Sequence, residues 1–475
     1  KTISFPRLKW QFQMATEFLC KNKVYLPELL DAHFEDKKFY IIDFSKKSGC
    51  IIQYKKSTVM TGPYLYGTHG FLAGIRKGLI RGKKTGKTIR LRTPTEGFIV
   101  AHDENFYDSA SYVHRTINSR HSLQYPPCGI YFMGGGGDIA LSCKVQALLD
   151  AQIPSHGIII SDLFNNNSVA KIPWISTYPD LTGEIRCYNK AGMTPCAILK
   201  IRYDTNSRQT ACNYSQEHFQ LLKNSGFDFL GLEPNAMMPL YSQQKLADYI
   251  IKSSMQNNFK IGFSYAQSLP IHYTYQLYDI KAHESVIKRI STVCNASYGA
   301  YAVCAPIISL NESIWHDILD FYKALEFALF CPLVVLDFGI DTNRSISFLK
   351  KSSLNVLLSM LELYKMLMPY HEFCISNFIQ NQAPIHYVPS FIKKPASIQT
   401  FMYGPDLIIG LNNNKHLDRF ELELPHGTWI HFWTGISYET GSLIINAPAG
   451  YPAVFYRADS SFTNLFDNIR RTRKI

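Results

Sequence analysis

The sequence lacks several features that would place it in a special class of protein. Its longest apolar run, Phe327–Leu336, contains Pro332 and is shorter than the roughly 18 apolar residues that a membrane-spanning helix needs. The stretch Lys1–Trp10 has no apolar core of the kind found in secretory signal peptides. We therefore expect a chain without a membrane span.

Cysteines are present, but their pattern indicates neither disulfides nor a metal centre. The eleven cysteines are odd in number, scattered, and form no Cys-x-x-Cys pair. Such thiols are typical of a reducing compartment such as the cytoplasm. No group of His, Cys and Asp has the spacing of metal ligands. The sequence predicts no cofactor.

Charged residues are few for a chain of 475 residues, at 18%, against 46% hydrophobic residues. This balance is typical of a folded globular protein and excludes intrinsic disorder. The formal net charge is nevertheless +12. Nucleic acid or another anionic surface is therefore a candidate partner.

Part of this charge gathers in the segment Ile75–Arg92, which contains no acid. Its eight basic residues are Arg76, Lys77, Arg81, Lys83, Lys84, Lys87, Arg90 and Arg92. The segment is a candidate for binding phosphates or an acidic protein surface, and a solvated loop is the alternative. It is not a P-loop, because Gly82 and Gly86 are one place too close and a strand-like run follows where a helix is needed.

The hydrophobic pattern divides the chain into three parts. Residues 1–120 alternate short β-like runs with Gly, Lys and Pro turns and predict a β-rich N-terminal domain. Over residues 125–392, eight apolar strand-like runs alternate with mostly helical segments, which predicts an α/β fold, a (β/α)8 TIM barrel. A doubly wound open sheet is the alternative. Residues 395–468 predict a C-terminal β-sandwich.

The predicted barrel strands matter because chemistry in such barrels lies at their C-terminal ends. We expect strands at 129–133, 156–161, 194–203, 227–233, 259–266, 298–305, 332–339 and 384–389. Three of them end on acids, Asp162, Glu233 and Asp337. These acids are candidates for binding or cleaving a sugar, and helix capping is the alternative role.

The C-terminal block carries a resemblance to a known family. The run Gly427–Gly435, with Trp429 and Trp433, precedes a second run from Pro452 to Ala458. This block resembles the C-terminal end of glycoside hydrolase family 31 and is most similar to its sulfoquinovosidase branch. The resemblance implies a TIM barrel with β-sandwich modules and retaining α-glycoside hydrolysis, in which two carboxylates lie about 5–5.5 Å apart.

At the catalytic positions that this resemblance implies, the sequence departs from the family. The family nucleophile is an Asp at the end of the fourth strand, where this chain has Leu232 or Glu233. The family acid/base is the Asp of a His-Ser-Asp-Ile-Gly-Gly run after the sixth strand, and we match Pro306 to it. Proline cannot donate a proton, so general acid help of about 10²–10⁴-fold would be lost.

The sugar-binding segments that the resemblance implies are altered as well. The family's Arg-Thr-His-Glu-Gly run is replaced by Val335–Gly339. The sulfoquinovosidase branch holds a sulfonate with an Arg and a Trp after the second strand. Lys171 and Trp174 are the stand-ins for these two residues.

These departures predict a chain that kept the family fold and lost its reaction. We interpret it as a sugar-binding or structural subunit with protein partners in a larger assembly or a homo-oligomer. One alternative is an active retaining α-glycosidase with relocated acids, using Glu233 with Asp162, Glu312 or Asp337. The other alternative is a nucleic-acid-binding protein, which rests on charge alone.

Overall fold

The computed structural model describes most of the chain from residue 125 onward. The ranges with side chains are 125–164, 174–200, 217–233, 258–265, 275–340 with internal gaps, 350–381, 383–387, 399–413 and 418–473. For the strands of the N-terminal part and for the ends of some later elements, the backbone alone is described.

Eight parallel strands form the centre of the molecule and close into a barrel. In chain order they are β10 (Gly129–Gly134), β11 (Gly157–Ile160), β12 (Thr194–Asp204), β14 (Phe229–Pro234), β15 (Lys260–Tyr265), β16 (Thr274–Asp279), β17 (Ala302–Ser309) and β18 (Leu333–Asp337). Strand β10 pairs with both β11 and β18, and β11 also pairs with β12, so the ring has no open edge. The predicted TIM barrel is confirmed, and the open sheet is excluded.

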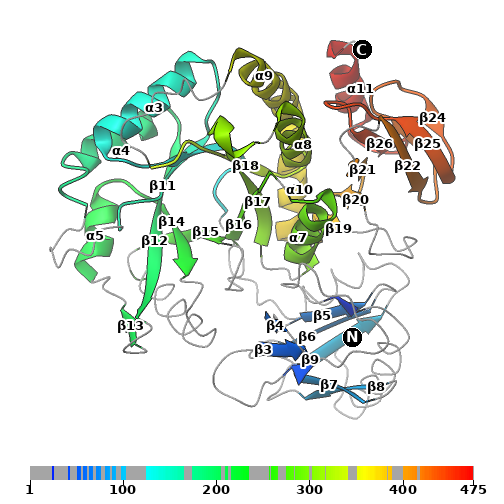
Figure 1. Ribbon diagram of the computed structural model, residues 1–475, viewed down its shortest axis with the longest axis horizontal. Helices are drawn as coiled ribbons and strands as arrows, with labels where there is room; N and C mark the ends of the chain where they lie inside the picture. The colour runs from blue at the N-terminus through cyan, green and yellow to red at the C-terminus, as the bar shows by residue number, and fades with distance from the viewer. Residues whose placement is uncertain are drawn as a thin grey trace.

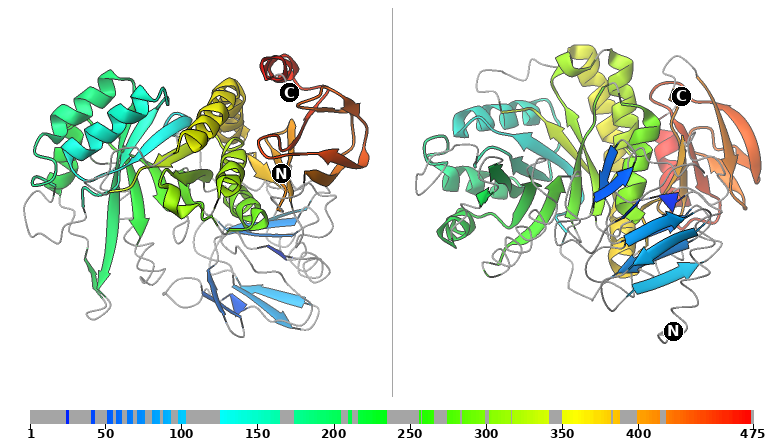
Figure 2. Two further views of the ribbon diagram at one scale, coloured as in Figure 1. Left: turned by 45° about the horizontal axis from the view of Figure 1, so that its top comes forward. Right: turned by 60° about the horizontal axis from the view of Figure 1, so that its bottom comes forward.

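Helices cover the outside of this barrel (Figure 1). They are α3 (Asp138–Asp150), α4 (Leu181–Lys190), α5 (Gln216–Asn224), α7 (Val286–Tyr298), α8 (Ile318–Ala328), α9 (Lys351–Met366) and α10 (Met368–Asn381), with a short 3₁₀ helix at Glu312–Ile314. In α9 the residues Leu357, Leu361 and Tyr364 are buried, as expected from their spacing on one helical face. Helices α8, α9 and α10 lie between the barrel and the C-terminal sheets (Figure 2).

Two of the predicted strands were numbered wrongly. The sixth barrel strand is β16, which the sequence pattern did not reveal, so the run 302–309 forms the seventh strand and Leu333–Asp337 the eighth. The run expected as the eighth strand contains β19 (His386–Tyr387), which pairs with β20 (Thr400–Tyr403) of the C-terminal sheet. The correction changes which residues lie at the sixth strand end.

The C-terminal part contains two antiparallel sheets. One has the order β19-β20-β21-β26-β23-β24, and β22 pairs with β25 in the other. The further strands are β21 (Leu407–Gly410), β22 (Arg419–Leu424), β23 (Trp429–His431), β24 (Ser437–Tyr438), β25 (Gly441–Asn446) and β26 (Ala453–Arg457), and α11 (Thr463–Thr472) follows them. Alternate residues of β22 are buried, as the two-residue period of a half-buried strand predicts.

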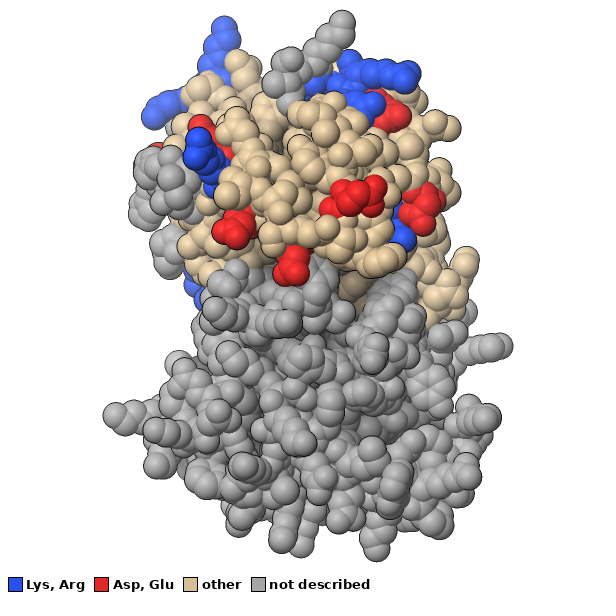
Figure 3. Space-filling view, turned by 90° about the vertical axis from the view of Figure 1, so that its right-hand side faces the viewer, with Lys and Arg blue, Asp and Glu red and all other residues tan. Residues whose placement is uncertain are grey.

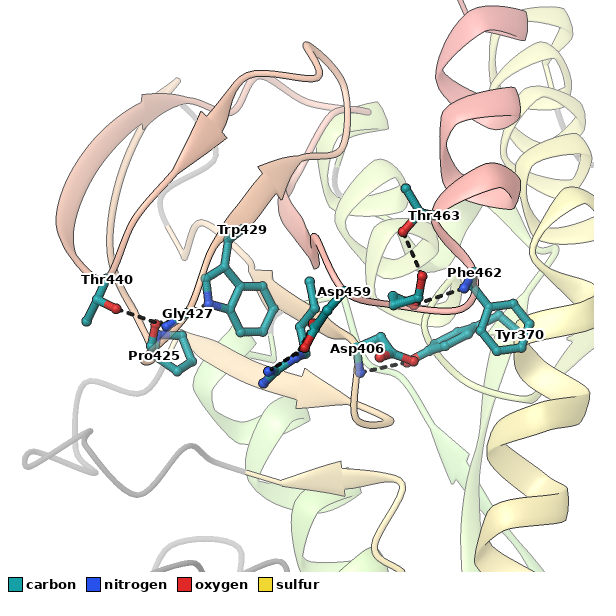
Figure 4. A network of polar contacts seen from close by, with 11 residues as sticks. Tyr370, Asp406, Pro425, Gly427, Trp429, Thr440, Asp459, Phe462 and Thr463 are labelled. Carbon is teal, nitrogen blue, oxygen red and sulfur yellow. Dashed lines mark hydrogen bonds and ion pairs between the residues drawn. The ribbon is translucent and has the colours of Figure 1, made fainter.

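Polar contacts fix this sandwich to the barrel helices (Figure 4). The Tyr370 hydroxyl of α10 donates to the Tyr403 carbonyl at 2.9 Å and accepts from the Asp406 N–H at 3.1 Å. Arg457 binds Asp459 through Nε at 3.0 Å and lies over the Trp429 ring at 5.7 Å from its centroid. The tryptophan and arginine of the C-terminal block therefore have structural contacts in the sandwich.

The N-terminal strands form two antiparallel sheets, with orders β1-β5-β6-β9 and β4-β3-β2-β7-β8. Their bounds are β1 (Val24–Tyr25), β2 (Ile41–Ile42), β3 (Ile51–Tyr54), β4 (Ser57–Met60), β5 (Tyr64–Gly67), β6 (Phe71–Ile75), β7 (Arg81–Thr85), β8 (Thr88–Arg92) and β9 (Phe98–His102). A further strand, β13 (Gln209–Ala211), pairs with the end of β12. The exact domain boundaries stay a prediction.

Candidate functional site

An aromatic cluster packs inside the barrel, on the N-terminal side of the residues at the mouth. It shows which strand faces point inward. Tyr131 of β10 contacts Phe263 of β15 at 5.6 Å between ring centroids, and Phe263 contacts Tyr275 of β16 at 5.9 Å. Strands β10 and β15 are not neighbours in the ring, so their contact crosses the interior. These three side chains therefore face the barrel axis, as in other packed barrels.

Strand alternation then identifies the residues at the mouth of the barrel. Residues two positions apart share a strand face, so Met133, Tyr265 and Asp279 also point inward, nearer the C-terminal ends. A direct contact supports this, because the Tyr265 hydroxyl lies 3.7 Å from the Met133 sulfur. Asp337 pairs in register with Met133 and shares its face.

The fourth strand adds an acid to the same mouth. A Cβ on Gly231 would lie 3.1 Å from the Phe263 Cβ, so Gly231 faces inward and Glu233, two residues later, does so too. The Glu233 Oε2 lies 3.7 Å from the Lys200 Nζ, and these two residues are register partners of β14 and β12. We define the barrel mouth as Lys200, Glu233, Tyr265, Asp279 and Asp337.

The three carboxylates of the barrel mouth act electrostatically on one hydroxyl. Burial raises the pKa of Tyr265, and negative charge on Glu233, Asp337 and Asp279 raises it further. Coulombic influence of this kind requires the charges to lie within several ångströms of the hydroxyl. Acids from the fourth, sixth and eighth strands therefore converge around Tyr265.

Asp337 is the most strongly perturbed of these acids. Burial raises the pKa of its carboxyl to about 6, and the charge of Asp279 adds to the effect. The Gly339 N–H donates to its Oδ1 at 2.9 Å and Lys144 lies nearby, and both oppose the rise. A carboxyl with a pKa near neutrality is typical of functional sites, because it exchanges protons at working pH.

Asp279 ends the sixth strand and differs from Asp337 in exposure. The residue as a whole is exposed to solvent, yet its carboxyl is partly desolvated by neighbouring protein. This desolvation raises its pKa, Lys281 opposes the rise and Glu284 adds to it. The sequence reasoning missed Asp279 because it missed strand β16.

Pro306, matched to the acid/base from sequence, does not belong to the mouth. It lies in the seventh strand, β17, in register with Tyr278 of β16. The inward residues of β16 are Tyr275, Leu277 and Asp279, so Pro306 faces outward with Tyr278. The sequence run that we matched to the family acid/base therefore belongs to the seventh strand. The sixth strand of the structure, β16, ends on an acid, Asp279.

Asp162 uses both carboxylate oxygens inside the protein. Its Oδ2 accepts the Gly136 N–H at 2.8 Å, and its Oδ1 accepts the Tyr178 hydroxyl at 2.5 Å. A Cβ on Gly135 would lie 2.3 Å from the Asp162 carboxyl, so glycine is required for this close approach. The structure gives Asp162 a role in holding the glycine-rich loop before α3, and its predicted role in sugar binding is untested.

The remaining predicted site residues are not gathered at the mouth within the part of the chain that is described. Trp174 is buried at 4% exposure and packs against Phe164 at 5.3 Å between ring centroids. Lys171 and the side chain of Glu312 lie outside the described residues. The stand-in roles proposed for Lys171 and Trp174 stay predictions.

The eight basic residues of the segment 75–92 also lie outside the residues whose side chains are described. The backbone of five of them lies in the paired strands β7 and β8, in which Arg81 opposes Arg92 and Lys83 opposes Arg90. The strand β8 confirms that this segment lacks the helix of a P-loop. On the sandwich side of the molecule, the described surface shows separate acidic and basic side chains on a mostly uncharged face (Figure 3).

Two further expectations concern what the described residues contain. None of the helices described is long and apolar enough to cross a membrane. Among the same residues, no cluster of His, Cys, Asp and Glu has the geometry to hold a metal ion. The cysteines of the described ranges are free thiols, as expected.

Comparison with known proteins gives the chain a family context. No protein-family model matches the chain. The sulfoquinovosidase of Escherichia coli K12 is 36% identical over 70 residues, 15% of this chain and 10% of that protein. The sulfoquinovosidase of Agrobacterium fabrum is 32% identical over 119 residues, 23% of this chain and 18% of that protein. The matched stretches thus span less than a fifth of both enzymes.

Solved structures extend the likeness to nearly the whole chain. A family 31 sulfoquinovosidase from E. rectale, in complex with an aza-sugar inhibitor, has a TM-score of 0.68 at 15% identity, covering 96% of this chain and 84% of that chain. The family 31 dextranase of Flavobacterium johnsoniae, complexed with glucose, has a TM-score of 0.66 at 11% identity, covering 92% and 65%. This chain is therefore similar in short stretches of sequence to sulfoquinovosidases and similar in fold to solved structures of glycoside hydrolase family 31.

Proposed function

We propose that this chain binds a sugar at the barrel mouth. The observation that carries the proposal is the convergence of Glu233, Asp279 and Asp337 around the Tyr265 hydroxyl. Carboxylate oxygens accept hydrogen bonds from sugar hydroxyls, and the Tyr265 hydroxyl and the Lys200 ammonium can donate to them. The site lies at the strand ends, where ligands of such barrels bind.

The proposal includes loss of the family reaction. The fourth strand end carries Glu233, a longer acid than the family Asp, and it already pairs with Lys200 at 3.7 Å. A nucleophile must lie within a fraction of an ångström of its working position, so an added methylene is a serious change. The segment Val335–Gly339, matched from the sequence to a family run that follows the seventh strand, lies at the end of the eighth strand, so this match does not support the loss.

Hydrolysis is a second candidate function, and Asp279 is the observation that favours it. The family acid/base follows the sixth strand, and in this chain the sixth strand ends on Asp279 with a raised carboxyl pKa. In this reaction Glu233 would attack the anomeric carbon while Asp279 protonates the leaving oxygen. Water activated by the Asp279 carboxylate would then release the sugar from Glu233.

Sugar binding is tested by titration calorimetry of the full chain with methyl α-D-glucopyranoside and methyl α-sulfoquinovoside. We expect heat of binding for at least one sugar, lost in Asp337→Asn and in Tyr265→Phe. Glu421→Gln, an exposed acid of β22, is the control and should bind as the unmodified chain does. Unchanged binding in both mouth variants, or no binding at all, would overturn the proposal.

Hydrolysis is tested with the 4-nitrophenyl and methyl α-glycosides of the same sugars. If the reaction persists, Glu233→Gln should abolish it. Asp279→Asn should lose about 10²–10⁴-fold on the methyl glycoside and less on the nitrophenyl one, whose leaving group needs little protonation. No turnover of any of them by the unmodified chain would support the catalytic loss.

The sequence also predicts that this chain is a subunit of a larger assembly. We propose that the basic β7–β8 hairpin contacts its partner. Its register places Arg81 opposite Arg92 and Lys83 opposite Arg90. Like charges directly opposite each other destabilise a strand pair. Two such pairs in one hairpin favour an anionic partner surface, and salt-dependent binding of a polyanion is the measurement that tests it.

A further inference from the structure

A buried cation lies beside the loop that follows Asp279. Arg289 of α7 is 2% exposed, and none of the described ion pairs involves it. Burial lowers the pKa of its guanidinium, and four nearby acidic groups oppose this effect. Those groups are Tyr278, Glu284, Asp320 and Glu326. A buried charge without a close partner is costly, so its position calls for a physical reason.

Within the described part of the chain, a single hydrogen bond of the Arg289 guanidinium points to that reason. Its Nη2 donates to the Lys281 carbonyl at 3.2 Å, two residues after Asp279. Its Nε and Nη1 are buried and have no hydrogen-bond partner among the described residues. The guanidinium is therefore directed at the backbone that carries Asp279 rather than at a neighbouring carboxylate.

The same loop is held at its other end by charged groups. The Tyr278 hydroxyl donates to Glu284 Oε2, and Glu284 also pairs with Lys288 at 3.2 Å. The Val286 N–H, at the start of α7, donates to Asn413 Oδ1 of the C-terminal part at 3.1 Å. Loop and helix are thus joined to both the barrel and the sandwich.

Helix α8 is joined to the C-terminal part by two hydrogen bonds. Glu326 is 3% exposed and accepts the Gly450 N–H, and Lys323 donates to the Asn412 carbonyl at 2.7 Å. Among the groups that raise the pKa of the Arg289 guanidinium, Tyr278 and Glu284 have the larger effects, and Asp320 and Glu326 of α8 follow them. The sandwich therefore holds α8 by two hydrogen bonds.

From these contacts we infer that Arg289 is a positioning residue for the Asp279 carboxyl at the barrel mouth. It acts through the Lys281 carbonyl, which accepts a hydrogen bond from its Nη2. The inference deepens the proposed function and rests on it for the role of Asp279. The loop geometry itself, however, can be measured without any sugar.

The test compares Arg289→Met, Arg289→Lys and the control Arg186→Met, an exposed arginine of α4. Hydrogen exchange of the backbone amides between Ile280 and Ser285 is read by mass spectrometry. We expect Arg289→Met to speed this exchange about tenfold or more, because the loop loses its anchor. Arg289→Lys should restore part of the protection, and Arg186→Met should change nothing.

A second readout separates positioning from general stability. The carbon-13 signal of the Asp279 carboxyl, identified by its absence in Asp279→Asn, should shift in Arg289→Met and return toward its place in Arg289→Lys. The urea midpoint should change little, because apolar replacement of a buried charge is often neutral. Unchanged exchange and an unmoved carboxyl signal would overturn the inference, as would a uniform rise in exchange with loss of stability. A shifted signal without sugar binding would instead contradict only the proposed function.

Discussion

Replacing Asp337 by asparagine should make the protein more stable at alkaline pH. The native carboxyl has a pKa of about 6 against an ordinary 3.8. Because the native state holds the proton more tightly than the unfolded state, stability from this group is present at low pH and is lost as pH rises through 6. A rise of about two pH units, at about 1.4 kcal/mol per unit, corresponds to at most about 3 kcal/mol.

Asparagine resembles the protonated acid and keeps an oxygen that can accept the Gly339 N–H. We therefore expect Asp337→Asn to gain up to about 3 kcal/mol over the unmodified chain at pH 8 and little at pH 4. The assay is urea unfolding followed by circular dichroism at both values. Asp418→Asn, an exposed acid of the sandwich, is the matched control. The reasoning would be refuted if the free energy of unfolding changed by the same amount between pH 4 and pH 8 in Asp337→Asn and in the unmodified chain.

Three further predictions concern other parts of the molecule. Burial lowers the ring pKa of His371 to about 3 and of His386 to about 4, so stability from these neutral rings is present above pH 6.5 and is lost on acidification. Between pH 6.5 and about 4, the free energy of unfolding of His386→Gln should fall by about 1.4 kcal/mol less per pH unit than that of the unmodified chain. Trp433→Phe should cost about 1–3 kcal/mol in the free energy of unfolding, because it removes the indole N–H that donates to the Pro452 carbonyl at 2.6 Å; an unchanged urea midpoint would contradict this. Lys83→Glu, opposite an arginine in the β7–β8 hairpin, should elute from a heparin column at lower salt, and elution at the same salt would count against an anionic partner.

Much of the barrel could be predicted because its strands are apolar along their length. Runs such as 157–160 and 333–337 are buried on both faces and carry an unmistakable pattern. The spacing of Leu357, Leu361 and Tyr364 likewise located the buried face of α9. In these elements local pattern and tertiary packing agree.

Strand β16 could not be found in the same way. It follows β15 after only eight residues, whereas the expected rhythm placed a helix between successive strands. Its sequence alternates inward Tyr275 and Leu277 with Gln276 and Tyr278, which is weaker than an apolar run. To reach eight strands, the sequence analysis therefore counted the segment at His386 as a barrel strand. It did not identify Asp279 as the acid at the end of the sixth strand.

The candidate site depended on this count because each of the five residues of the barrel mouth comes from a different barrel strand. The Glu233 position was foreseen, since the fourth strand was numbered correctly. Asp337 was foreseen as an acid, but its raised pKa follows from burial and from Asp279, neither of which a one-dimensional pattern contains. Tyr265 became important only when acids from its two neighbouring strands and from β18 were seen to face the same mouth.

The pairing of β10 with β18 has a consequence for how the protein is made. The first barrel strand finds its second neighbour about two hundred residues later in the chain, at Leu333–Asp337. Until the ribosome has released that segment, β10 presents an open edge on which another nascent chain can add. Contacts of such long sequence separation also form slowly. Production of this protein should therefore depend on chaperones that shield the growing barrel, and any truncation before residue 337 should aggregate.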